Sequence, residues 1–122
     1  MVDMSATLLH HGHIRLLKKA SELGQVVVAL TTDEEIKAKK GYEPELNYSQ
    51  RKEILEAIRY VDEVVPSKWM LTDAFLEEQC IDLLVHGDDN SNEISRNKLV
   101  IFPRTKGISS ELIRAKLKKA DE

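Results

Sequence analysis

The sequence predicts a single α/β domain with a Rossmann-like, doubly wound parallel sheet. Short apolar runs rich in β-branched residues alternate with segments of helical periodicity, as in proteins whose parallel strands are joined by crossover helices. The 122 residues suffice for one hydrophobic core and are too few for two. We therefore expect one domain over residues 1–122, with helices covering both faces of the sheet.

The first half of the chain opens with a weak strand signal. Residues 1–4 form a first strand that is very short or truncated, because polar residues follow at once. Residues 13–23 repeat apolar side chains at helical spacing, and residues 25–31 (QVVVALT) are typical of a buried strand. Residues 37–47 are polar and contain a glycine and a proline, which predicts a mobile loop over one edge of the sheet.

The second half alternates more regularly. Three short runs rich in Val, Ile and Leu predict buried strands at residues 61–65, 81–86 and 98–102. Three segments with apolar residues at helical spacing predict helices at residues 49–60, 71–80 and 110–119.

Charge and composition exclude several classes of protein. The 18 Lys and Arg residues are outnumbered by 21 Asp and Glu, so bulk electrostatics do not favour nucleic acid, and an anionic ligand must be held by a local basic cluster. No apolar run approaches the ~20 residues of a membrane span, and no signal peptide is recognisable. The lone Cys80 excludes an internal disulfide and a thiolate metal cage. We expect a soluble cytoplasmic protein.

The first candidate site is His10-His11-Gly12-His13, at the start of the first predicted helix. His10 and His13 are three residues apart, which places both imidazoles on one side of a helical turn, beside its positive N-terminus. Gly12 allows a ligand to approach the backbone. Two other interpretations remain: a metal site, to which His86 could contribute, and ordinary polarity at a helix start.

The second candidate site is residues 104–110 (RTKGISS), between the last predicted strand and the last predicted helix. Basic side chains, a glycine and hydroxyls at a helix N-terminus form an arrangement that binds phosphate. The site also lies at the carboxyl edge of the sheet, where open α/β proteins bind ligands. Ser109 or Ser110 could instead cap the helix, which contributes ~1 kcal/mol, but a cap alone would not require Arg104 and Lys106.

Two further groups of residues are weaker candidates. Residues 86–90 (HGDDN) follow a strand end, so their carboxylates could accept from ribose hydroxyls or pair with a cation, although the same residues suit an ordinary turn. Arg51 and Arg59 bracket an apolar helical stripe, which predicts a second anion subsite. A snorkelling surface arginine would explain one of them. Lys37, Lys39 and Lys40 are by default a solvated charge run.

Together these motifs resemble the cytidylyltransferase family, over the stretch from Leu8 to Leu117. The family's HxGH corresponds to residues 10–13 and its RTxGISS/T to residues 104–110. Its TTDE, RK, RxVDEV and GDD motifs correspond in order to residues 31–34, 51–52, 59–64 and 87–89. The resemblance implies transfer of CMP from CTP to a small phosphate or phosphonate, with release of pyrophosphate.

The resemblance also implies roles for individual residues. It assigns catalysis to His10, His13 and Arg104. It assigns nucleotide binding to Leu8, Gly12, Asp88, Arg104, Thr105, Gly107, Ile108, Ser109 and Ser110, and acceptor binding to Thr7, Lys39, Arg51 and Arg59. It further implies Mg²⁺ held mostly through water and substrate oxygens, with no ligands assigned in this chain, and a homodimer.

Two departures from the family pattern concern the acceptor. The family usually has glycine, a small residue, phenylalanine and aspartate where this chain has Met4-Ser5-Ala6-Thr7, and a tryptophan where it has Asn90. Residues 2–13 (VDMSATLLHHGH) are similar to nucleotidyltransferase-like domains associated with phosphoenolpyruvate mutases, which favours a phosphonate acceptor. Two rival functions stay open: an adenylyltransferase that uses ATP, and a non-catalytic nucleotide-binding domain.

Overall fold

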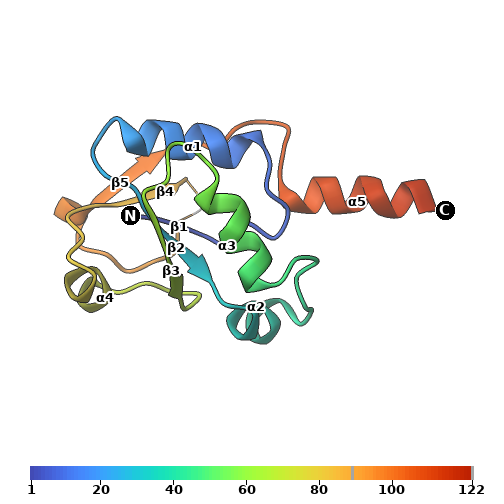
Figure 1. Cartoon of the computed structure of the whole chain (residues 1–122), viewed down its shortest axis with the longest axis horizontal. Helices are drawn as coiled ribbons and strands as arrows, with labels where there is room; N and C mark the ends of the chain where they lie inside the picture. Colours follow the sequence, from blue (N-terminus) through green and yellow to red (C-terminus); the bar gives the residue numbers. More distant parts are fainter. Residues whose placement is uncertain (89, 122) are drawn as a thin grey trace.

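A five-stranded parallel sheet in the order β3-β2-β1-β4-β5 forms the centre of the molecule (Figure 1). The computed structural model describes residues 1–88 and 90–121. The strands are β1 (Val2–Met4), β2 (Val27–Thr31), β3 (Glu63–Ser67), β4 (Leu84–Gly87) and β5 (Leu99–Phe102). The chain adds strands on one side of β1 and then on the other, so the topological switch point lies between β1 and β4. The predicted Rossmann-like class is confirmed.

Helices cover both faces of this sheet, as predicted. They are α1 (His11–Ser21), α2 (Asp33–Lys40), α3 (Tyr48–Glu56), α4 (Asp73–Glu78), a 3₁₀ turn η1 (Arg96–Lys98) and α5 (Ser110–Asp121). Most of them lie against the sheet, whereas α5 extends away from the body of the domain (Figure 1). The short first strand is central in the sheet, although it has only three residues.

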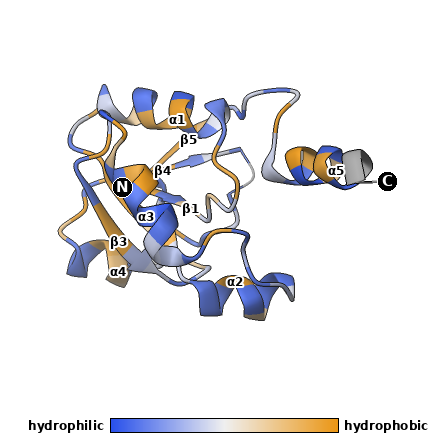
Figure 2. Cartoon of the chain, turned by 45° about the vertical axis from the view of Figure 1, so that its right-hand side comes forward, coloured by the Kyte–Doolittle hydropathy of each residue, from blue (hydrophilic) through white to orange (hydrophobic). Residues whose placement is uncertain are grey.

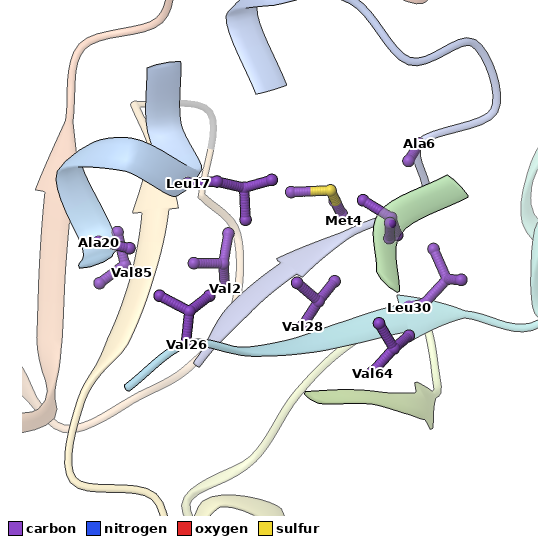
Figure 3. Packing of buried hydrophobic residues seen from close by; sticks show 11 residues of the cluster. Val2, Met4, Ala6, Leu17, Ala20, Val26, Val28, Leu30, Val64 and Val85 are labelled. Carbon is purple, nitrogen blue, oxygen red and sulfur yellow. The ribbon is translucent and has the colours of Figure 1, made fainter. Parts of the chain in front are cut away.

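Alternate residues of the strands belong to two separate apolar clusters, one on each face of the sheet. One cluster joins Val2, Val28 and Val85 of the sheet to α1 and α3 through Leu17 and Leu55 (Figure 3). The other lies against α4 and contains Met1, Ala29, Leu71, Leu76, Leu84 and Ile94. Because successive strand residues point to opposite faces, Val85 belongs to the first cluster and Leu84 to the second.

The predicted mobile loop at residues 37–47 is wrong in its first part, because Lys37, Lys39 and Lys40 belong to α2. Thr32 caps this helix, acidic residues fill its first turn, and the three lysines occupy its last turn, where the helix dipole favours cations. Gly41 ends the helix with a φ of 80°. Ile36 is its one buried residue, and the helix is hydrophilic over most of its surface (Figure 2). The sequence pattern did not predict this helix because it lacks a stripe of apolar residues at helical spacing.

No helix in the described part of the chain is both long enough and apolar enough to cross a membrane.

Candidate active site

A cavity of about 240 Å³ lies at the carboxyl edge of the sheet, between the N-termini of α1 and α5. It is lined by residues from both predicted motifs, including His10, Gly12, His13, Arg104, Thr105, Ile108, Ser109 and Ser110. Its floor includes residues of β1 and β4, so it lies at the topological switch point, where open α/β sheets bind ligands. The two motifs, about 90 residues apart in sequence, therefore meet in one pocket.

His10 and His13 cap α1 reciprocally. The Gly12 N–H donates to His10 Nδ1 (3.1 Å), the His10 N–H donates to His13 Nδ1 (3.1 Å), and the ring centroids are 4.0 Å apart. Because each Nδ1 is an acceptor, the neutral form of each ring carries its proton on Nε2. Burial is the main cause that lowers the pKa of both groups, that of His13 to about 4. Each imidazole is thus neutral at pH 7 and can still donate one hydrogen bond.

Gly12 is needed for this cap. A Cβ atom at this position would lie 2.8 Å from Cε1 and 2.9 Å from Nδ1 of His10, well inside van der Waals contact. A larger residue would push the His10 ring away from the Gly12 N–H. The glycine therefore shapes the histidine pair as well as leaving the backbone accessible.

The N-terminus of α5 faces the same pocket. The Leu112 N–H donates to Ser109 Oγ (3.1 Å), so Ser109 caps the helix, and Ser110 Oγ donates to the Leu8 carbonyl (2.9 Å). The second bond fastens α5 beside the entry to α1. Gly107, with a φ of 80°, provides the left-handed turn before the helix. Two helix N-termini therefore point toward one cavity, which favours an anionic ligand.

Basic side chains surround this cavity in an otherwise acidic protein. Arg104 lines it and pairs with Asp88 (Nε to Oδ1, 3.1 Å), with both side chains well exposed. Arg15 and Lys19, four residues apart on α1, also line the cavity and were not predicted, although their spacing from His11 places them on one helical face. The cavity therefore has the local basic cluster that an anionic ligand needs in a protein of negative net charge.

Arg51 lies elsewhere, and its position contradicts the predicted contact with an acceptor anion. Its side chain is 1% exposed, and its guanidinium is occupied by protein oxygens. Its N–H groups donate to the carbonyls of Leu46 (3.1 Å), Ser5 (2.7 Å) and Thr31 (2.9 Å) and to Asp33 Oδ1 (2.7 Å). A helical stripe does not reveal this, because burial of the charge depends on loop carbonyls distant in sequence.

The other residues assigned to the acceptor do not line the cavity either. Lys39 is exposed near the end of α2, and Arg59 is exposed after α3, where it donates to the Tyr60 hydroxyl (2.8 Å). Thr7 is buried, and its hydroxyl accepts from Arg114 Nη2 (3.2 Å). Arg114, which belongs to none of the sequence motifs, also pairs with Glu45 through two nitrogens (2.6 and 3.0 Å).

No group of three or more His, Cys, Asp or Glu side chains within residues 1–88 and 90–121 is arranged to hold a metal ion. His86, which could have joined His10 and His13 as a third ligand, contacts the Asp3 carboxylate. Asp89 of the GDD motif lies outside the described residues.

The chain is similar to proteins named as cytidylyltransferases and as FAD synthases. The chain is similar to glycerol-3-phosphate cytidylyltransferases of Staphylococcus aureus (42% identity over 118 residues, covering 90% of this chain and 87% of that protein) and Bacillus subtilis (44% over 118 residues, covering 90% and 89%). It is also similar to an FAD synthase of Thermococcus sibiricus (33% over 109 residues, covering 88% and 72%).

One solved structure, the lipopolysaccharide core biosynthesis protein from Thermoplasma volcanium, matches with a TM-score of 0.64 and 20% identity, covering 99% of this chain and 86% of that one. At this identity the likeness supports the fold alone. The family model described as cytidylyltransferase-like matches residues 7–116, which include both motifs of the pocket. The chain therefore belongs to the cytidylyltransferase-like family.

Proposed function

We propose that this protein is a cytoplasmic cytidylyltransferase that transfers CMP from CTP to a small phosphate-bearing acceptor and releases pyrophosphate. The observation that carries the proposal is the single cavity faced by His10, His13 and the N-terminus of α5. The similarity to glycerol-3-phosphate cytidylyltransferases makes glycerol 3-phosphate the first acceptor to test.

The chemistry of the reaction fits the side chains of the cavity. A phosphate dianion is already a nucleophile at neutral pH, so no general base is needed. One of its oxygens bonds to the α-phosphorus of CTP, and the bond to the bridging oxygen of pyrophosphate breaks with its electron pair. The protein must align the groups and neutralise charge. His10 and His13 donate Nε2–H to the triphosphate, and Arg104 with the start of α5 holds the leaving phosphates.

The cavity suits Mg²⁺ bound through the substrate rather than in a protein cage. Among the described carboxylates nearby, Asp3 is engaged by His86 and Asn92, and Asp88 by Arg104. We propose that the triphosphate oxygens and water hold most of the coordination sphere, with Asp88 near the mouth of the cavity. When bound, Mg²⁺ neutralises charge on the phosphates.

A phosphonate acceptor is the finer proposal. It rests on Thr7, which stands where the family usually has an aspartate. Thr7 places no negative charge where an aspartate would repel a dianionic acceptor, and the charge of the adjacent Arg114 is balanced by Glu45.

The second candidate function is an adenylyltransferase, which the similarity to FAD synthase favours. Pyrophosphate release is measured with CTP or ATP and with glycerol 3-phosphate, choline phosphate and small alkylphosphonates as acceptors. We expect CTP to be used. Preference for ATP would select the alternative, and nucleotide binding without pyrophosphate release would select a non-catalytic domain. Preference for glycerol 3-phosphate over every phosphonate would exclude the finer proposal.

We also propose that the protein is a homodimer. Leu112 and Leu117 of α5 are exposed, at 48% and 57%, and so is Ile101 of the edge strand β5. Exposed apolar side chains on a projecting helix and at a sheet edge favour association. Sedimentation equilibrium at micromolar concentration tests this, and a monomer mass would exclude it.

A further inference from the structure

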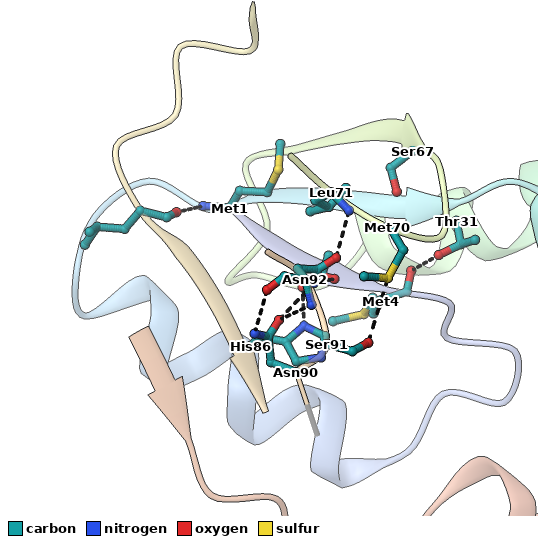
Figure 4. A network of polar contacts seen from close by, with 12 residues as sticks. Met1, Met4, Thr31, Ser67, Met70, Leu71, His86, Asn90, Ser91 and Asn92 are labelled. Carbon is teal, nitrogen blue, oxygen red and sulfur yellow. Dashed lines mark hydrogen bonds and ion pairs between the residues drawn. The ribbon is translucent and has the colours of Figure 1, made fainter. Parts of the chain in front are cut away.

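A partly buried polar network lies along the floor of the cavity. Asp3 of β1 contacts His86 Nδ1 of β4 through its Oδ1, and its Oδ2 accepts from Asn92 Nδ2 (3.0 Å). Asn92 Oδ1 in turn accepts from the Leu71 N–H (2.7 Å), as the dashed lines in Figure 4 show. The side chains of Asp3 and His86 are 10% and 19% exposed. Residues 83 apart in sequence are thus held together inside the protein.

The pair lies at the topological switch point of the sheet, where open α/β proteins bind their ligands. Registered pairing between β1 and β4 joins Val2 to Val85, and Asp3 and His86 are the next residues of the two strands. Both line the cavity. Val2 and Met4 face α1, and Asp3, which lies between them on the strand, faces the other side of the sheet. The pair therefore approaches the carboxyl edge of the sheet from the face opposite to that of His10 and His13.

The charge of the pair distinguishes it from the rest of the cavity. With Asp3 ionised, its carboxylate only accepts, so His86 Nδ1 is the donor in this contact, the reverse of the arrangement in His10 and His13. With its carboxylate ionised, the pair adds no net positive charge to this end of the cavity. Phosphate groups prefer the basic side of the cavity, where Arg15, Lys19 and Arg104 lie.

An uncharged hydroxyl fits this end of the cavity best. A hydroxyl both donates and accepts hydrogen bonds, so it matches an imidazole in either protonation state. We propose that the Asp3–His86 pair is a hydroxyl-recognising subsite, in which His86 contacts the substrate and Asp3 and Asn92 position His86. The inference rests on the proposed function, whose two substrates both carry hydroxyls: the ribose of CTP and the glycerol of the acceptor.

The experiment measures kcat/KM for wild type, Asp3→Asn, His86→Gln and the double variant. One arm compares CTP with 2′-deoxy-CTP and 3′-deoxy-CTP, and the other compares glycerol 3-phosphate with propyl phosphate. Wild type is expected to prefer the hydroxyl-bearing substrate by about tenfold in one arm, roughly the effect of one hydrogen bond. Each single variant should reduce that preference below about threefold, and the double variant should lose no more, since Asp3 acts through His86.

The matched control is Asp73→Asn. The Asp73 carboxylate accepts from the N–H (3.1 Å) and the hydroxyl of Ser95, which lies in the same segment after β4 as Asn92. Asp73 does not line the cavity. This variant should keep the substrate preference. Asparagine nearly matches aspartate in shape, and thermal unfolding checks each fold. If Asp3→Asn does not fold, the ¹⁵N signals of the wild-type His86 ring should shift with CTP or glycerol 3-phosphate, and unchanged signals would overturn the proposal.

Other outcomes would exclude the subsite, the positioning role of Asp3 or the proposed function. A wild type without preference in either arm, or a preference that survives both variants, excludes the subsite. Additive losses in the double variant exclude the positioning role of Asp3. Failure of the proposed function is a separate result, namely no pyrophosphate from CTP with any acceptor. Calorimetric affinities for the same nucleotides and acceptors then test the same preferences without turnover.

Discussion

At the residue scale, we propose that His13 is a hydrogen-bond donor to the triphosphate, besides its part in the cap of α1. Its ring accepts one backbone hydrogen bond at Nδ1 and lines the cavity, while the buried residues of the apolar clusters do not include it. We expect His13→Ala to lower kcat by roughly 10² or more, because it removes a donor directed at developing charge. Steady-state pyrophosphate release gives kcat, and circular dichroism checks that the fold persists. Turnover close to that of wild type would contradict the role.

His13 also predicts how stability depends on pH. Burial lowers its pKa from 6.5 to about 4 in the folded protein, so between these pH values the unfolded chain binds more protons. Stability therefore falls as pH drops from about 6.5 toward 4, by at most about 3 kcal/mol from this residue. Urea unfolding at pH 7 and pH 4.5 measures the loss. His13→Gln, which cannot ionise, should lose less stability over this interval, and an equal loss would contradict the assignment.

At the element scale, α5 is connected to the loop before α3 mainly through Arg114. The guanidinium pairs with Glu45, whose pKa it lowers mainly by hydrogen bonding, and lies over the Tyr42 ring at 5.0 Å. The contact joins α5 to residues 41–47, which follow the lysines of α2.

Arg114→Ala should release this loop. We expect hydrogen exchange of residues 41–47 to rise several-fold while α1 and the sheet keep their protection, because the change removes the bidentate pair. Lys40→Ala is the matched control, since Lys40 contacts Glu111 of α5 at 3.8 Å through one exposed ion pair, which contributes little. Unchanged exchange in Arg114→Ala, or an equal rise in the control, would refute the connection.

At the scale of the whole molecule, Arg51 connects strands of the sheet to segments outside it. It bonds the segment after β1, the end of β2, the loop before α3 and Asp33 of α2. We expect Arg51→Ala to reduce the free energy of unfolding by about 3–5 kcal/mol, since it leaves buried acceptors without a donor. Urea denaturation measures this.

The exposed Arg104→Ala serves as the comparison for Arg51→Ala. It should weaken CTP binding and change the free energy of unfolding by less than about 1 kcal/mol. An Arg51→Ala variant of wild-type stability with only a raised KM for the acceptor would restore the original assignment.

The sequence by itself determined the order of the five strands and of the four helices α1, α3, α4 and α5, the parallel sheet and the two motifs of the cavity. These features follow from local periodicity and from residue types at helix starts, which short segments carry on their own. The structure alone decided that Arg51 is a buried connector, that Lys37, Lys39 and Lys40 end a helix, and that Asp3 meets His86. The contacts of Arg51 and of Asp3 depend on which segments lie side by side once the strands are ordered, and periodicity within a segment does not encode its neighbours across the sheet. The helix that the lysines end has local caps at Thr32 and Gly41 but only one buried residue, so it lacks the apolar stripe by which the other helices were predicted.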